Sequence, residues 1–174
     1  MIKAIVCADN SWAIGKNNDL LYNIKEDMRM FKSITTNHGD GGIVVMGENT
    51  LLSLPNQKPL PKRINIVLCK DDHKYDGFIC IHDFNELVRI LKLISKVYDV
   101  YVIGGGMLYK SLLPYYDEVF VTKVNNIDLE AAVFFPNLDE NSDFELSFKS
   151  SDSTEEGFPY TYNFCIYKRI GGKN

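Results

Sequence analysis

Short apolar runs alternate with amphipathic stretches along most of the chain. The runs predict buried strands at 2–8, 43–46, 64–69, 78–81, 100–103 and 119–124. Apolar residues at helical spacing predict helices at 24–34, 49–54, 83–97 and 107–113. Beyond Pro136, segments 144–148 and 160–167 alternate apolar and polar residues, which is typical of antiparallel strands. This order predicts an α/β fold with a mostly parallel sheet and an antiparallel end.

Two details refine this prediction. The polar stretch 9–23 contains glycine and asparagine and is predicted to be one long loop. Asp83, with Glu86 three residues later, predicts an N-terminal cap for the helix at 83–97, whose apolar face includes Val97.

Composition and charge limit the classes of partner that the protein can bind. A chain of 174 residues with 45% hydrophobic residues fits one globular domain over 1–174. Its net charge of -4 disfavours a nucleic-acid partner, which needs a basic face. No apolar run is long enough to span a membrane, and no signal-peptide pattern occurs, so we expect a soluble cytoplasmic protein that binds small molecules. The cysteines and histidines lack metal-site spacing, so we expect core thiols and no metal.

Asp27 is a carboxylate in an unexpected position. With Ile24 at 0° on a helical wheel, Met28, Phe31 and Ile34 fall at about 40°, 340° and 280°, and Asp27 falls among them at about 300°. Glu26 falls on the polar side and is predicted to be solvated. A buried carboxylate needs a partner, and a ligand with adjacent N–H donors would serve. The alternative is an acid that only favours the helix dipole.

Two strand-to-helix junctions are rich in glycine. Gly47 follows the strand 43–46, and Gly104, Gly105 and Gly106 follow the strand 100–103. Each can seat a phosphate because glycine allows close backbone approach, and two seats suit a dinucleotide. Tyr109 breaks the G-x-G-x-x-G pattern, so a Rossmann fingerprint is excluded and a simple tight turn stays open. Arg63, after Pro59-Leu60-Pro61, is either a carboxylate clamp or part of a solvated basic turn.

The motifs, taken together in order, resemble the dihydrofolate reductase family over essentially the whole chain. They are Trp12-Ala13-Ile14-Gly15, Asn23-Ile24 with Asp27-Met28 and Phe31-Lys32, Val45-Met46-Gly47 with Thr50, Pro59-Leu60-Pro61 with Arg63-Ile64-Asn65, Val102-Ile103-Gly104-Gly105-Gly106 with Tyr109, Val121-Thr122, and Phe134-Phe135-Pro136. The resemblance implies a three-layer α/β/α fold around an eight-stranded mixed sheet, with an antiparallel C-terminal strand. It also implies reduction of 7,8-dihydrofolate to tetrahydrofolate by NADPH for one-carbon metabolism. Antifolate binding, a monomer and a cis Gly104-Gly105 peptide are further implications.

The resemblance also assigns residues. Catalytic roles are implied for Asp27, Leu20, Tyr22 and Thr122. The folate pocket would comprise Ile5, Cys7, Asp27, Met28, Phe31, Leu54, Leu60, Arg63, Ile103 and Thr122, with Arg63 clamping the glutamate carboxylate. The NADPH site would comprise Cys7, Ile14, Gly15, Asn18, Leu20, Gly47, Glu48, Asn49, Thr50, Leu68, Cys69, Lys70, Ile103, Gly104, Gly105, Gly106, Met107, Leu108 and Tyr109.

Some positions depart from the family pattern. Glu48 stands where family members commonly have a basic residue that binds the 2′-phosphate of the cofactor. We therefore expect that NADPH is still preferred over NADH, with Lys70 compensating, but by a smaller factor than is usual in the family. Ala132 stands where the family commonly has an aspartate that holds the loop 9–23 closed, so we expect a mobile loop unless Glu130 or Asn125 substitutes. A riboflavin-pathway reductase and a non-catalytic nucleotide-binding module are the competing interpretations, and Asp27 with Arg63 disfavours the former.

Overall fold

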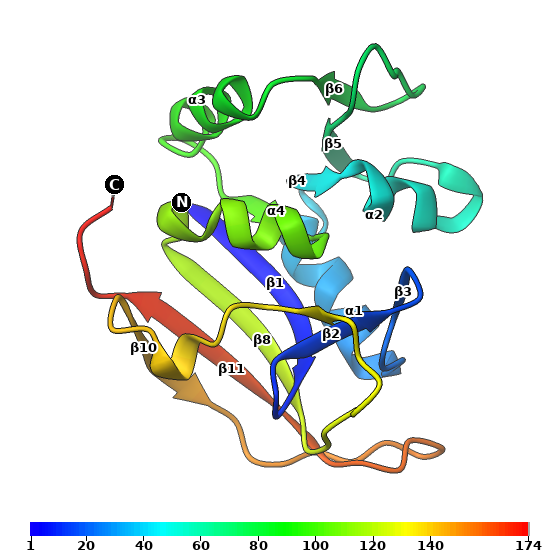
Figure 1. The fold of residues 1–174 in the computed structure, drawn as a ribbon, viewed down its shortest axis with the longest axis vertical. Helices are drawn as coiled ribbons and strands as arrows, with labels where there is room; N and C mark the ends of the chain where they lie inside the picture. The colour runs from blue at the N-terminus through cyan, green and yellow to red at the C-terminus, as the bar shows by residue number, and fades with distance from the viewer. Residues whose placement is uncertain (174) are drawn as a thin grey trace.

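The computed structural model describes residues 1–173, and eight of its strands form one twisted sheet (Figure 1). The order across the sheet is β10-β11-β8-β1-β7-β4-β5-β6. The strands are β1 (Ile2–Asp9), β4 (Gly42–Gly47), β5 (Arg63–Leu68), β6 (Ile79–Ile81), β7 (Val100–Val102), β8 (Glu118–Val124), β10 (Phe144–Lys149) and β11 (Tyr162–Arg169). Neighbours from β8 to β6 pair in parallel, and β11 is antiparallel to both β8 and β10. The predicted mixed sheet is confirmed.

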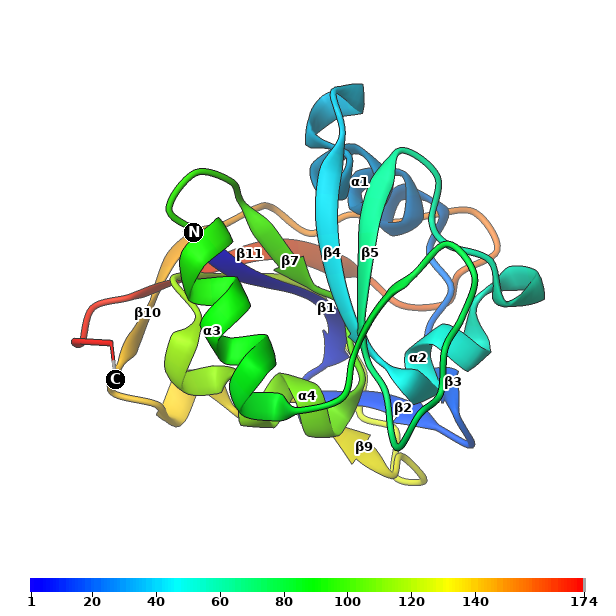
Figure 2. The same cartoon turned by 90° about the horizontal axis from the view of Figure 1, so that it is seen from above.

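Helices cover both faces of this sheet (Figure 2). They are α1 (Lys25–Thr35), α2 (Glu48–Ser53), α3 (Phe84–Ile94) and α4 (Gly106–Ser111), with short 3-10 turns at Asn37–Gly39, Pro55–Gln57, Leu113–Tyr115 and Leu138–Glu140. Side chains alternate along the buried strands: Val45 packs with Leu87 of α3, whereas Val44 and Met46 pack with Leu51 of α2. The sheet is therefore the middle layer of an α/β/α structure. No helix within residues 1–173 combines the length and apolarity needed to cross a membrane.

The helix ends follow local chemistry. Asp83 caps α3 by accepting a hydrogen bond of 2.9 Å from the Glu86 amide, as the sequence predicts. The prediction for Val97 is wrong: α3 ends at Ile94, and Val97 lies in the following turn with 76% of its surface exposed. A turn is needed there because the chain must reverse to enter β7.

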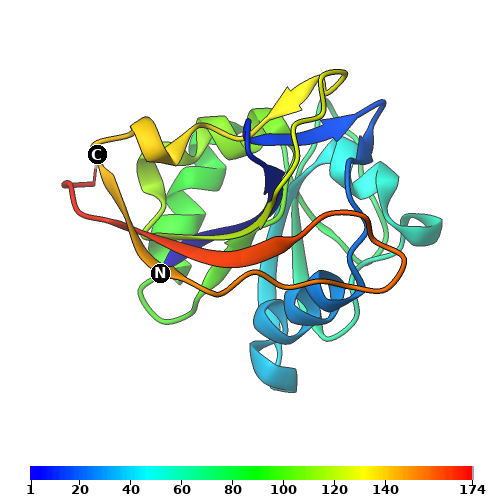
Figure 3. The same cartoon turned by 90° about the horizontal axis from the view of Figure 1, so that it is seen from below.

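The predicted loop 9–23 contains a small hairpin. β2 (Ala13–Lys16) pairs with β3 (Asp19–Leu20), and β9 (Val133–Phe134) pairs with the other edge of β2 (Figures 2 and 3). Asn17 and Asn18 both have positive φ, which is the backbone that a two-residue hairpin turn requires. We call residues 10–23 the lid and residues 125–135 the opposing segment.

Candidate active site

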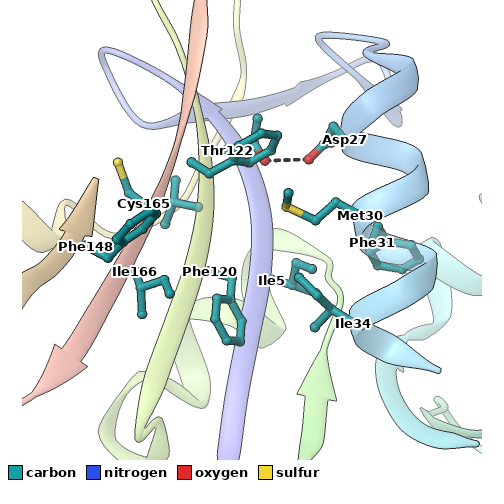
Figure 4. A pocket seen from close by; sticks show the side chains of 12 residues that line it. Ile5, Asp27, Met30, Phe31, Ile34, Phe120, Thr122, Phe148, Cys165 and Ile166 are labelled. Carbon is teal, nitrogen blue, oxygen red and sulfur yellow. Dashed lines mark hydrogen bonds between the residues drawn. The ribbon is translucent and has the colours of Figure 1, made fainter. Parts of the chain in front are cut away.

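Asp27 lies in the first turn of α1 and faces the sheet. Thr122 Oγ1 on β8 donates a hydrogen bond of 2.5 Å to Asp27 Oδ1 (Figure 4). The first amides of α1 are capped from elsewhere, since Glu155 accepts hydrogen bonds from the amides of Lys25 (2.9 Å) and Glu26 (3.0 Å). Asp27 is therefore not the cap of its helix, which disfavours the purely dipolar interpretation.

The electrostatics of Asp27 follow from its surroundings. Burial raises the pKa of the Asp27 carboxyl, the Thr122 hydrogen bond opposes that shift, and the charge of Glu26 adds to it. The net shift is upward, the direction expected for an acid on an apolar helix face. Among residues 1–173, Thr122 is the one hydrogen-bond donor to Asp27 and no cation pairs with it. The second oxygen, Oδ2, remains free to accept N–H groups from a ligand.

Glu26 differs from the sequence prediction of a solvated acid. Its carboxylate accepts a hydrogen bond of 2.5 Å from the Tyr162 hydroxyl. Because the donor comes from β11, 136 residues away, the helical wheel gives no sign of it. Glu26 therefore joins α1 to the C-terminal strand.

A cavity of about 200 Å³ opens beside Asp27, between α1 and the sheet (Figure 4). The structure brings four predicted residues to its wall: Ile5, Asp27, Phe31 and Thr122. Other wall residues were not predicted, among them Met30, Ile34, Phe120 and Phe164. Phe164 pairs with Thr122 across β11 and β8, so only the strand register reveals it.

The other predicted folate residues lie outside that wall. Leu54, Leu60 and Ile103, like Ile5, pack against the buried cluster that contains Met46 and Leu51. Cys7 is half-buried, and Met28 is 51% exposed. The buried amide of Asn65 holds the Leu60 segment, accepting from the Leu60 amide (2.9 Å) and donating to its carbonyl (3.0 Å).

Arg63 begins β5 and is held in one orientation. Its Nε donates to the Pro61 carbonyl (2.9 Å), and its Nη1 donates to Thr35 Oγ1 (3.0 Å). The guanidinium lies 6.0 Å from the centroid of the Phe31 ring. No acid within residues 1–173 pairs with Arg63, and burial lowers the pKa of its guanidinium. A fixed, half-buried cation of this kind favours the carboxylate clamp over a solvated turn.

The two glycine junctions meet in space. The Gly47 amide donates to the Gly104 carbonyl at 2.7 Å, and the Gly104-Gly105 peptide is cis. A Cβ atom would lie 3.0 Å from Thr50 Oγ1 if built on Gly104 and 3.4 Å if built on Gly105. Neither α2 nor α4 has a side-chain cap at its N-terminus. The backbone here is open and rich in N–H donors, which fits the pyrophosphate of a dinucleotide.

The remaining predicted cofactor residues differ in exposure. Ile14 and Gly15 lie on β2, Asn18 lies in the hairpin turn, and Leu68, Cys69 and Lys70 lie at the end of β5 and just beyond it. Leu20 and Met107 are 66% and 87% exposed, and Asn49 is also exposed. Leu108 and Tyr109 are buried, and the Tyr109 hydroxyl donates to the Ile5 carbonyl (2.8 Å). Their side chains therefore belong to the core, and only their backbone can face a cofactor.

Glu48 has partners that sequence analysis missed. Its carboxylate accepts from the Tyr75 hydroxyl (2.6 Å) and the Lys70 amide (3.2 Å), and His73 Nδ1 lies 2.5 Å away. The hydrogen bond from Tyr75 has the largest effect on the pKa of Glu48. Burial opposes it, but the contacts with His73 and Lys70 act in the same direction as Tyr75, and the pKa falls to about 2. Glu48 is thus ionised and bound to the loop after β5.

Comparisons with known proteins agree with this geometry. A family model described as dihydrofolate reductase matches residues 1–169. The chain belongs to the dihydrofolate reductase family. It is 34% identical over 170 residues to the dihydrofolate reductase of Bacillus subtilis (97% of this chain, 95% of the relative) and 32% identical over 179 residues to that of Schistosoma mansoni (95% of each). The solved dihydrofolate reductase from Enterococcus faecalis, complexed with NADP(H) and RAB-propyl, has a TM-score of 0.83 at 26% identity, covering 98% of this chain and 97% of that one.

Membership of the dihydrofolate reductase family confirms the main sequence-based expectations. The fold, the oxidoreductase activity on dihydrofolate and the cofactor NADPH all follow from it.

Proposed function

We propose that this chain reduces 7,8-dihydrofolate in the cleft beside α1, with Asp27 and Thr122 holding the pterin. The single observation that carries this assignment is the half-satisfied Asp27 carboxylate, which faces the sheet with Thr122 as its donor. The amidine edge of a pterin offers two adjacent N–H donors, which match a carboxylate with a free oxygen.

The other residues bind and orient. Ile5 and Phe31 form the apolar wall against the pterin, and Leu54 and Leu60 contact the rest of the folate. Arg63 clamps the glutamate carboxylate through its outer N–H groups, because Pro61 and Thr35 already hold the guanidinium in place. Gly47, Thr50 and the glycines at 104–106 would hold the NADPH pyrophosphate, and the end of β5 would hold its adenosine.

NADPH, when bound, supplies the hydride that reduces the pterin at C6. Asp27 fixes the ring orientation and polarises it electrostatically, which favours the charge that develops during reduction. The lid, with Leu20 near its tip and Tyr22 at its end, limits water around the reacting rings. The proton at N5 comes from water that the lid admits.

We further propose that the protein acts as a monomeric, cytoplasmic, single-domain enzyme that supplies one-carbon metabolism. Antifolates that carry a cationic amidine would pair with Asp27, since a raised pKa means that an opposite charge is needed to stabilise the carboxylate. Sedimentation of the purified protein tests the monomer directly.

A three-arm assay tests the function. The absorbance of NADPH is followed with dihydrofolate, with a riboflavin-pathway precursor and with neither substrate. Oxidation of NADPH only with dihydrofolate is expected. Oxidation only with the riboflavin precursor would assign the competing reductase activity. If NADPH is oxidised in no arm but binds to the protein in a separate titration, the chain is a nucleotide-binding module.

A further inference from the structure

Asp9 is a fully buried acid that the mechanism above does not use. It is the last residue of β1, where the sequence pattern suggests only the start of a turn, and its side chain has no exposed surface. A buried carboxylate is unfavourable unless donors surround it, so its partners indicate its role.

The Asp9 carboxylate accepts five hydrogen bonds. Oδ1 accepts from the Ser11 amide (2.9 Å), the Ser11 hydroxyl (2.7 Å) and the Ala13 amide (3.0 Å). Oδ2 accepts from the Asp128 amide (2.9 Å) and the Tyr22 hydroxyl (3.2 Å). The donors therefore come from the start of the lid, the end of the lid and the opposing segment.

Neighbouring contacts extend this connection. The Tyr22 hydroxyl also accepts from Asn126 Nδ2 at 3.1 Å, and the Asn10 amide donates to the Asn126 carbonyl at 3.0 Å. Burial on its own raises the pKa of Asp9, but the bonds from Asp128, Ser11 and Ala13 outweigh it and the net shift is downward. The carboxylate is thus ionised at neutral pH, and both of its oxygens are fully used as acceptors.

We propose that Asp9 is a positioning residue that latches the lid to the opposing segment and orients the Tyr22 hydroxyl. This inference rests on the proposed function only for its catalytic consequence, because the latch itself exists without substrate or cofactor. The two ends of the lid meet at the Asp9 side chain, so loss of that side chain frees both ends, while the pairing of β2 with β9 still holds the middle of the lid.

The substitution Asp9→Asn tests the latch specifically. The side-chain oxygen remains with the three donors at the Oδ1 position, which places the amide NH₂ against the Asp128 N–H. Two donors then oppose each other, and the bond to the opposing segment is lost. We expect the hydrogen exchange of the Asp128 amide to rise by about tenfold, the scale of one charge-assisted bond.

Trp12 gives a second readout that needs no ligand. It is the only tryptophan in the chain, lies in the lid and is 2% exposed against Phe135. In Asp9→Asn, acrylamide should quench its fluorescence more strongly than in the wild type. In single-turnover reactions of Asp9→Asn, hydride transfer should slow several-fold. In steady-state assays, KM for dihydrofolate should stay within about twofold of the wild-type value, because the substitution does not touch the folate residues.

Asp117→Asn is the matched control. Asp117 accepts a hydrogen bond of 2.8 Å from the Ile2 amide at the opposite end of β1. This control should lower stability without changing Asp128 exchange or Trp12 quenching. If Asp9→Asn does not fold, Ser11→Ala removes one of the five bonds and should still raise Trp12 quenching.

Unchanged Trp12 quenching and unchanged Asp128 exchange in a folded Asp9→Asn protein, or equal changes in Asp117→Asn, would overturn the latch. In the fallback case, unchanged quenching in Ser11→Ala would do so. If the wild-type protein fails to reduce dihydrofolate but the two ligand-free readouts respond as expected, the proposed function fails and the latch stands.

Discussion

Replacing Arg63 by lysine keeps the charge and removes the planar fork. In the structure, Nε and Nη1 are bound to Pro61 and Thr35, and these contacts hold the guanidinium 6.0 Å from the centroid of the Phe31 ring. A lysine ammonium can replace at most one of the two bonds to a carboxylate and cannot make the two positioning bonds at the same time. The expected loss is therefore one charge-assisted bond, about 1.5–3 kcal/mol, or about 10-fold to 150-fold in Kd.

The assay compares two ligands. Dissociation constants are measured for folate and for a pteridine that lacks the glutamate tail, in the wild type and in Arg63→Lys. Folate binding should weaken by the amount above, and pteridine binding should stay nearly unchanged. Arg89→Lys, the same change on α3 at the other face of the sheet, should affect neither ligand. Equal losses for both ligands in Arg63→Lys would refute the clamp.

Three further predictions concern Glu48, Ala132 and Asp27. Glu48→Arg should raise the ratio of kcat/KM for NADPH to that for NADH by about tenfold, because an ionised carboxylate is replaced by a cation; an unchanged ratio would mean that Glu48 does not face the 2′-phosphate. Ala132→Asp should change single-turnover hydride transfer by less than about twofold, since Asp9 and the Lys16–Glu130 ion pair already hold the lid; a large acceleration would show a loose lid. Ligand-free Asp27→Asn should melt at a higher temperature than the wild type at pH 7, and the difference should vanish below pH 3.8. A carboxyl whose pKa is raised by folding destabilises the fold progressively as pH rises from 3.8, and the destabilisation is complete once pH exceeds the raised pKa. Equal melting temperatures at pH 7 would contradict that sign.

The sequence was sufficient where a pattern is local. The helical wheel placed Asp27 on the buried face of α1, and strand-to-glycine junctions located Gly47 and Gly104. Long-range pairings were beyond it: Asp9 meets Asp128 across 119 residues, and Glu48 meets Tyr75 across 27. Local patterns carry no information on such partners, since the sheet register and the loop paths bring them together.

The lid shows a different cause of failure. Its two strands, β2 and β3, have only four and two residues, which is too short for alternation to be recognised, so the polar segment with two asparagines predicts a loop. Glu130 is another case in which the partner lies far away in the sequence. Glu130 and Asn125 are the two candidates to replace the missing acid at Ala132; in the structure Glu130 pairs with Lys16, 114 residues away, and Asn125 bonds to Thr161.

We propose above that the charge of Asp27, facing the sheet beside Thr122, drives the reduction of dihydrofolate. The most direct measurement is the turnover of Asp27→Asn with dihydrofolate and NADPH at neutral pH, beside Arg29→Gln as the control at an exposed position of the same helix. Asp27→Asn keeps the shape of the side chain, and its turnover should fall by on the order of 10²-fold or more, the scale of removing one preorganised charged group. Arg29→Gln should stay near the wild-type rate. Turnover of Asp27→Asn near the wild-type value, in a folded protein, would contradict the assignment.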